Sequence, residues 1–114
     1  ENNRIWTATN SGIYQLKVSN DFKSGIFKKL NPVIPEFNQP TYDLNLDSEK
    51  QLWAAFNEGV AIIDIKDLSY HLIKHDKTNP FSIPDADCRR VFFTSQGKCW
   101  LGFDGGGLCE LEII

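Results

Sequence analysis

The stretch "QLWAAFNEGVAIIDI", residues 51–65, decides the fold, because the chain holds it in three variant copies. The other two copies read "RIWTATNSGIYQLKV" at 4–18 and "KCWLGFDGGGLCELEI" at 98–113. Each copy has a tryptophan, each tryptophan is 47 residues from the next, and a glycine follows each one six positions later. Self-similarity at a fixed period of this length is the signature of a repeat protein. The repeat positions are Trp6, Trp53, Trp100, Gly12, Gly59 and Gly106.

The shared unit extends upstream of the tryptophan, since "TYDLNLDSEKQLW" at 41–53 aligns without a gap with "CRRVFFTSQGKCW" at 88–100. Segments such as "YDLNL" alternate apolar and polar residues, which is the two-residue period of a half-buried strand. The five prolines all fall between the apolar runs. The one complete unit is therefore predicted to hold four strands, at 41–46, 51–56, 60–65 and 70–75. The whole chain is predicted to hold about ten strands, in the order three, four, three.

Four short antiparallel strands that recur at this period are typical of a β-propeller blade. The predicted fold class is all-β, with blades of four antiparallel strands. The 114 residues amount to about 2.4 blades, fewer than the four to eight of a closed propeller. We therefore expect a partial propeller, incomplete as a single chain, with a partial blade at 1–40, a complete blade with its linker at 41–87, and a partial blade at 88–114. Its expected partners are the remaining blades of a longer chain or further copies of itself, three of which would total about seven blades.

The segment "NPFSIPDADCRRVFFTSQGKCWLGFDGGGL", 79–108, resembles the two-component regulator propeller repeat. That repeat typically runs through Asn-Pro, a Ser-Leu-Ser-like stretch, an apolar strand, Asp-x-x-Gly, Leu-Trp-Ile-Gly-Thr and Gly-Gly-Leu. The third copy departs from this pattern with Phe103 in place of threonine and Cys99 in place of leucine. The positions that fit the pattern are Pro80, Ser82, Ile83, Val91, Gly97, Trp100, Gly102, Gly106, Gly107 and Leu108.

The resemblance implies a sensor. In that family, arrays of such blades form the periplasmic part of bacterial hybrid two-component proteins, which respond to glycans and signal through a membrane-spanning histidine kinase. We therefore expect a non-catalytic, periplasmic sensory or ligand-binding fragment that takes an oligosaccharide, from a parent chain that carries the kinase. No kinase or DNA-binding sequence lies within these residues.

Binding residues are expected on the turns between the second and third strands and on the loops between blades, because propeller ligands commonly meet that face and such loops carry function on a rigid scaffold. The inter-blade loops are predicted at 31–40 and 77–87. The candidate binding residues are Asn10, Asn57, Glu58, Asp87 and Asp104.

Charge and composition exclude several other partners. Twelve basic residues against fifteen acidic ones leave nothing to neutralise a phosphate backbone, so no nucleic-acid partner is expected. No apolar stretch approaches the roughly 20 residues that span a bilayer, so this segment is not expected to insert into a membrane. Nucleotide-loop, nucleophile-elbow and zinc-protease patterns are absent from the sequence, so no cofactor or metal is expected.

The histidines and cysteines give no site either. His71 and His75 would lie about 13 Å apart along a strand, too far to share one ion. Cys88, Cys99 and Cys109 are out of register within their blade, so free, mostly buried thiols are expected. Two other function classes stay open. One is a propeller lyase of the streptogramin lyase type, which has a catalytic histidine near the axis, and the other is a protein-interaction scaffold.

Overall fold

The structure is a computed structural model that describes residues 4–29 and 39–112. These residues form ten strands in three separate antiparallel sheets and no helix. Most of the predicted loop at 31–40, at 31–38, lies outside the described residues, as do the two ends of the predicted partial blades. The predicted all-β class and the order of three, four and three strands are confirmed.

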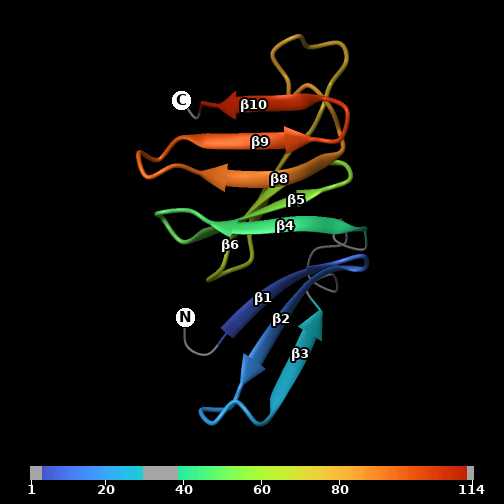
Figure 1. The fold of residues 1–114 in the computed structure, drawn as a ribbon. Helices are drawn as coiled ribbons and strands as arrows, with labels where there is room; N and C mark the ends of the chain where they lie inside the picture. Colours follow the sequence, from blue (N-terminus) through green and yellow to red (C-terminus); the bar gives the residue numbers. More distant parts are fainter. Residues whose placement is uncertain (1–3, 30–38, 113–114) are drawn as a thin grey trace.

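Each sheet is built from consecutive strands, and the sheets follow one another through the molecule (Figure 1). The first sheet consists of β1 (Arg4–Thr9), β2 (Gly12–Val18) and β3 (Gly25–Lys29). The middle sheet consists of β4 (Thr41–Leu46), β5 (Gln51–Phe56), β6 (Gly59–Asp64) and β7 (Tyr70–Ile73). The third sheet consists of β8 (Cys88–Phe93), β9 (Cys99–Phe103) and β10 (Gly107–Leu111).

Alignment of the repeat copies shows which of the four strands of a complete blade are present in the first and third sheets. The tryptophans lie on β1, β5 and β9, so β1 corresponds to the second strand of the middle sheet and β8 to its first strand. Among the described residues, the first sheet therefore has no innermost strand and the third sheet no outermost one. Strands β4 and β5 occupy the predicted positions, and β6 is shifted by one residue. The predicted end of the fourth strand at residue 75 is wrong, since β7 ends at Ile73.

Alternation along each strand gives every sheet two apolar faces, and both faces of the middle sheet are covered. Leu52, Ala54 and Phe56 face the first sheet and pack with its Ile13 and Trp6. On the other side, Trp53 and Ala55 pack against the third sheet. Each tryptophan thus shares a face with the small residue two positions later. Because blades stack through these faces, the core of the molecule lies between sheets rather than within one.

The innermost strands of adjacent sheets are joined by hydrogen bonds to the backbone. The amide of Val91 on β8 donates to Asp43 Oδ2 on β4 at 3.0 Å, and Asn45 Nδ2 donates to the carbonyl of Val91 at 3.2 Å. Both β4 and β8 carry a register shift near their first residues, at Thr41/Asp43 and Cys88/Arg90, which are equivalent positions of the repeat. The same irregularity is therefore present at the start of the innermost strand in both sheets.

Glycine begins the third strand of each blade because the backbone there has a positive φ. Gly12 has a φ of 111° and Gly59 a φ of 137°. The extra residue in the third copy moves this position to Gly107, whose φ is 79° and which begins β10. Gly106 is restricted for a different reason, since a Cβ there would lie 2.7 Å from Cβ of Asp85. The "DGGG" stretch is thus a hairpin turn between two strands.

Candidate functional site

The predicted binding residues lie at one end of the sheets, on turns that belong to different blades. Asn10 is exposed in the β1–β2 turn, and Glu58 is exposed in the β5–β6 turn. Next to Glu58, Asn57 has a buried side-chain Oδ1 with no hydrogen-bond partner among the described residues. Asp104 lies in the β9–β10 turn, and Asp87 directly precedes β8.

Asp87 and Asp104 are brought together by Arg89. The guanidinium of Arg89 bonds Asp87 at 3.0 and 3.2 Å and Asp104 at 3.2 Å, while the Asp104 amide donates to the carbonyl of Asp87. Hydrogen bonding to Asp87 raises the pKa of Arg89. Its Cζ lies 4.1 Å from the ring centroid of Tyr42 on β4. Two of the five predicted residues therefore form an ion-pair cluster that joins neighbouring sheets.

The connection between β7 and β8 is fixed by its own side chains. His75 lies beyond β7, and its Nδ1 is 2.7 Å from the carbonyl of Ile83. Ser82 Oγ accepts the amide of Asp76 at 2.9 Å. His71 stays on β7 and is exposed. Within 4–29 and 39–112, no group of three or more histidine, cysteine or acidic side chains is arranged to hold a metal ion.

The three cysteines are free, as predicted, and face the middle sheet from the third sheet. In the β9–β10 register Cys99 is opposite Leu111, so Cys99 and Cys109 are two residues out of register. Burial raises the pKa of Cys88 to about 12 and that of Cys99 to about 11. Both thiols are therefore protonated near neutral pH, which disfavours them as nucleophiles.

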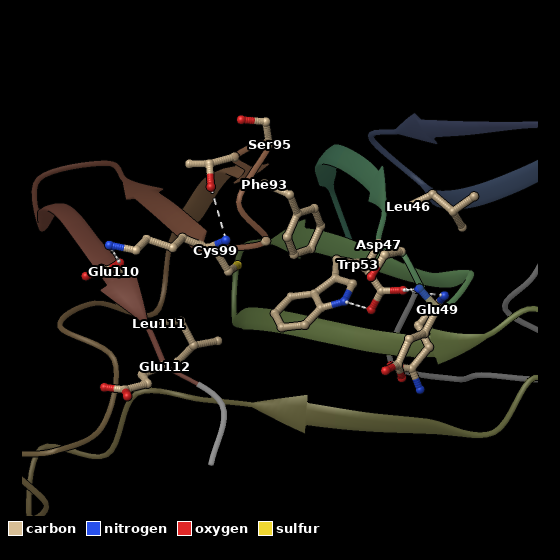
Figure 2. Close-up of a pocket in the computed structure, with 15 residues that line it drawn as sticks. Leu46, Asp47, Glu49, Trp53, Phe93, Ser95, Cys99, Glu110, Leu111 and Glu112 are labelled. Carbon is tan, nitrogen blue, oxygen red and sulfur yellow. Dashed lines mark hydrogen bonds and ion pairs between the residues drawn. The ribbon is translucent and has the colours of Figure 1, made fainter.

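A concave feature lies at the opposite end of the sheets, on turns where the sequence predicted no binding residue (Figure 2). It is a groove of about 730 Å³, within the usual range for a small-molecule site. The β4–β5 turn, the β8–β9 turn and the end of β10 line it, so both the middle and the third sheet contribute. The lining residues are Leu46, Asp47, Ser48, Glu49, Gln51, Trp53, Phe93, Thr94, Ser95, Gly97, Lys98, Cys99, Glu110, Leu111 and Glu112.

Asp47 fixes the wall that the middle sheet contributes. Its Oδ1 accepts the amides of Glu49 and Gln51, both at 2.9 Å, and its Oδ2 accepts Nε1 of Trp53 at 2.9 Å. Figure 2 shows this carboxylate between the turn and the indole ring. The ring of Trp53 meets that of Phe93 edge-on, with centroids 5.2 Å apart. The two sheets therefore share an aromatic contact at the base of the groove.

The rim of the groove is acidic. The lining holds four carboxylates, those of Asp47, Glu49, Glu110 and Glu112, and one ammonium group, that of Lys98. Lys98 Nζ lies 3.7 Å from Glu110 Oε2, so part of the positive charge is already paired. Hydroxyl and amide groups complete the lining. The groove thus offers many acceptors and an apolar base, and it repels anions.

One sequence signal could have located the groove. Residues 46–51 and 93–98 occupy equivalent positions of the repeat, and both turns follow the innermost strand of a blade. Thr94 Oγ1 accepts the amides of Gln96 and Lys98 just as Asp47 Oδ1 accepts those two and four residues after it. The predicted binding residues instead lie on the turns at the other end of the sheets.

No protein-family model matches the chain, and no curated protein matches it. Solved structures do. The chain matches the extracellular domain of the hybrid two-component system BT3049 from B. thetaiotaomicron with a TM-score of 0.68 and 21% identity over 92% of its length. It matches the corresponding domain of BT4673 from the same organism with a TM-score of 0.71 and 20% identity over 93%. The chain spans 13% of the length of each of these structures. None of the described residues forms a helix long and apolar enough to cross a membrane. The blades of this chain therefore have the fold found in the extracellular domains of hybrid two-component systems.

Proposed function

We propose that this chain is a non-catalytic, ligand-binding portion of a periplasmic sensor propeller, whose parent protein signals through a histidine kinase. The observation that carries the proposal is the shared fold with two extracellular domains of hybrid two-component systems over more than nine-tenths of the chain. The side chains support the absence of catalysis, because His75 bonds a backbone carbonyl and burial keeps the Cys88 and Cys99 thiols protonated.

The groove between the middle and third sheets is the proposed ligand site. Its volume suits a short oligosaccharide, its acceptors suit sugar hydroxyls, and the half-buried ring of Phe93 suits an apolar sugar face. The excess of carboxylates disfavours sulfated and uronic acid sugars. The ligand class is therefore a neutral oligosaccharide or one that carries amino groups.

The candidate residues at the other end of the sheets give a second location for the same ligand. Asp87 and Asp104 are already bonded to Arg89, so their oxygens are less available to a ligand. Asn57, with its unpartnered buried oxygen, and the exposed Asn10 and Glu58 complete this proposed set. Variants at the two ends separate the two locations.

The test is a calorimetric titration with three probes, a glucosamine trimer, an N-acetylglucosamine trimer and a heparin-derived tetrasaccharide. We expect one of the first two to bind, and Phe93→Ala to weaken that binding by about tenfold or more, a change of about 1.4 kcal/mol. Asp104→Asn is the matched control and leaves it unchanged. Binding of the heparin fragment alone, or loss of binding in Asp104→Asn but not in Phe93→Ala, contradicts the proposed groove site.

A further inference from the structure

The first sheet carries an apolar and basic surface at its outer edge, on β3 and the turn before it. Phe22 in that turn is 72% exposed, and Ile26 on β3 is 73% exposed. Residues 17–29 hold four lysines and one acidic residue, although the chain as a whole has a net charge of −3. We call this surface the outer patch. It consists of Lys17, Phe22, Lys23, Ile26 and Lys28.

The stacking of blades does not cover this edge, as the middle sheet shows. Lys17 pairs with Ile26, and the amide of Asp64, 47 residues after Lys17, donates to the carbonyl of Ser69. Ser69 therefore holds the position of Ile26 in the middle sheet. Neighbouring sheets pack on both faces of the middle sheet, yet Ser69 is exposed. The exposure of Ile26 thus comes from its place at the periphery of a blade, which a further stacked sheet would not change.

The turn in the outer patch is longer than its counterpart and is held by its own bonds. Eight residues separate Lys17 from Ile26, whereas four separate Asp64 from Ser69. Ser19 Oγ donates to Asp21 Oδ1 at 2.6 Å, and the amide of residue 23 donates to the same oxygen at 3.0 Å. Figure 1 shows the turn projecting from the molecule on the side away from the third sheet. The first sheet therefore has a fixed projection that the middle sheet lacks.

Phe22 is held in a costly backbone conformation on this turn. Its φ of 59° lies in the left-handed region, which a bulky residue rarely adopts. Because its ring is 72% exposed, burial within the chain offsets little of that cost. Such strain is typical of residues that serve binding. An aromatic ring held by a rigid turn also loses little conformational freedom when a partner covers it.

The basic charge belongs to the first sheet and is not a property of the repeat. The equivalent segment of the middle sheet, 64–72, holds one lysine and two acidic residues. β3 is also the outermost strand of its sheet, and among the described residues no strand pairs with its outer side. Every second residue of such a strand directs its amide and carbonyl away from the sheet. The lysines discourage pairing with a second copy of β3, since like charges would meet, and they favour an acidic segment.

We propose that the outer patch is a docking site for another protein, which adds an extended acidic segment as a strand along the outer edge of β3. Main-chain hydrogen bonds to β3 give affinity in this mode of binding, and the side chains give specificity. Apolar side chains of the segment cover Phe22 and Ile26, and its carboxylates meet the lysines of the patch. The groove between the middle and third sheets takes no part in this contact, so the two sites are independent.

Two octapeptides test the charge and the location. One alternates glutamate and valine, and the other alternates lysine and valine. In titrations of the 114-residue chain followed by ¹⁵N NMR, we expect the glutamate peptide to bind with a Kd of about 1 mM or tighter and to shift the amides of 22–28. We expect the lysine peptide not to bind. Absence of binding by the glutamate peptide, equal binding of both peptides, or shifts on β7 in place of β3 overturns the proposal.

Lys28 and His71 give a matched pair of variants. Lys28 pairs with Gln15 and His71 with Ile62, which is 47 residues after Gln15, so the two positions are equivalent, and both are exposed. Lys28→Glu should weaken binding of the glutamate peptide by about tenfold or more, and His71→Glu should leave it unchanged. Circular dichroism checks that both variants keep their strands. A folded Lys28→Glu protein that binds as the parent chain does contradicts the proposal.

A third peptide tests the addition of a strand. The glutamate peptide with every backbone amide N-methylated keeps its charges and side chains but has no amide to donate to β3. We expect it not to bind. If it binds as tightly as the unmodified peptide, the side chains alone make the contact and strand addition is wrong.

Discussion

The hydrogen bond between Asp47 and the Trp53 indole is the contact whose removal tests most directly how the groove is built. Trp53 is 1% exposed, so its Nε1 has no access to water once the carboxylate is gone. The repeat supplies the right substitution. Thr94 occupies the equivalent position in the third sheet and makes the same two bonds to turn amides. Asp47→Thr should therefore keep the β4–β5 turn and remove only the bond to the indole.

The expected loss follows from the type of bond. A hydrogen bond to a charged group contributes about 1.5–3 kcal/mol, and a buried donor left without a partner costs a similar amount. With a denaturant dependence of about 1–3 kcal/mol per molar urea, the unfolding midpoint of Asp47→Thr should fall by about 1 M. Asp47→Ala also removes both hydrogen bonds to the turn amides, so its unfolding midpoint should fall further.

A double-mutant cycle isolates the bond itself. Trp53→Phe removes the donor, so Asp47→Thr made in that background should change the free energy of unfolding little. The sum of the losses in the two single variants should therefore exceed the loss in the double variant by about 1.5–3 kcal/mol. Urea unfolding followed by circular dichroism, at one fixed protein concentration, gives all four values. Additivity within about 0.5 kcal/mol would show that the carboxylate does not stabilise the indole, and the reasoning would fail.

Three further predictions concern stability. Gly59→Ala should lower the free energy of unfolding by more than about 3 kcal/mol, because a Cβ there would overlap the carbonyl oxygen of Ile73. Gly97→Ala, with nothing within 4 Å of its Cβ, should lower it by only about 1 kcal/mol because of the positive φ, and thermal melts compare the two variants. Asp43→Ala should cost about 1–3 kcal/mol by leaving an inter-sheet amide unpaired, measured by urea unfolding. Burial raises the pKa of Cys88 from 9.0 to about 12. The stability that the neutral thiol contributes to the folded state is therefore complete below pH 9 and is lost as the pH rises toward 12. Unfolding free energies at pH 8 and 10 should therefore differ less in Cys88→Val than in the parent chain.

The repeat made most of the fold predictable. The spacing of the tryptophans fixed the unit, and period-two alternation located β4 and β5 within it. The end of the fourth strand was not predictable in this way, because the alternation in "YHLIKH" is broken by the apolar pair of Leu72 and Ile73 and marks no end point. Beyond Ile73 the chain belongs to the connection, where His75 bonds the carbonyl of Ile83, eight residues ahead.

The candidate site was less predictable, for a different physical reason. Asp87 and Asp104 could be placed at the same end of a blade from the sequence, but Arg89, which joins them, was not identified. The groove depends on two turns, around Asp47 and Thr94, that come together only when the middle and third sheets stack. Strand periodicity describes one sheet at a time, so it carries no information on such a surface.

The three copies also separate the residues that hold blades together from those that are free to serve a ligand. The tryptophan, the small residue two positions later and the positive-φ glycine recur in every blade, because each sheet must fit the next one. In the turns that line the groove, only Ser48 and Ser95 are identical among the six aligned positions of 46–51 and 93–98. Exposed turns vary even where nothing binds, so divergence alone does not make a site. Here the divergent positions also surround the groove, whose acidic lining the stacking of blades does not require. If the groove has no ligand, reversing the charge of its carboxylates should leave function unchanged. If the groove binds amino sugars, the same reversal should abolish binding.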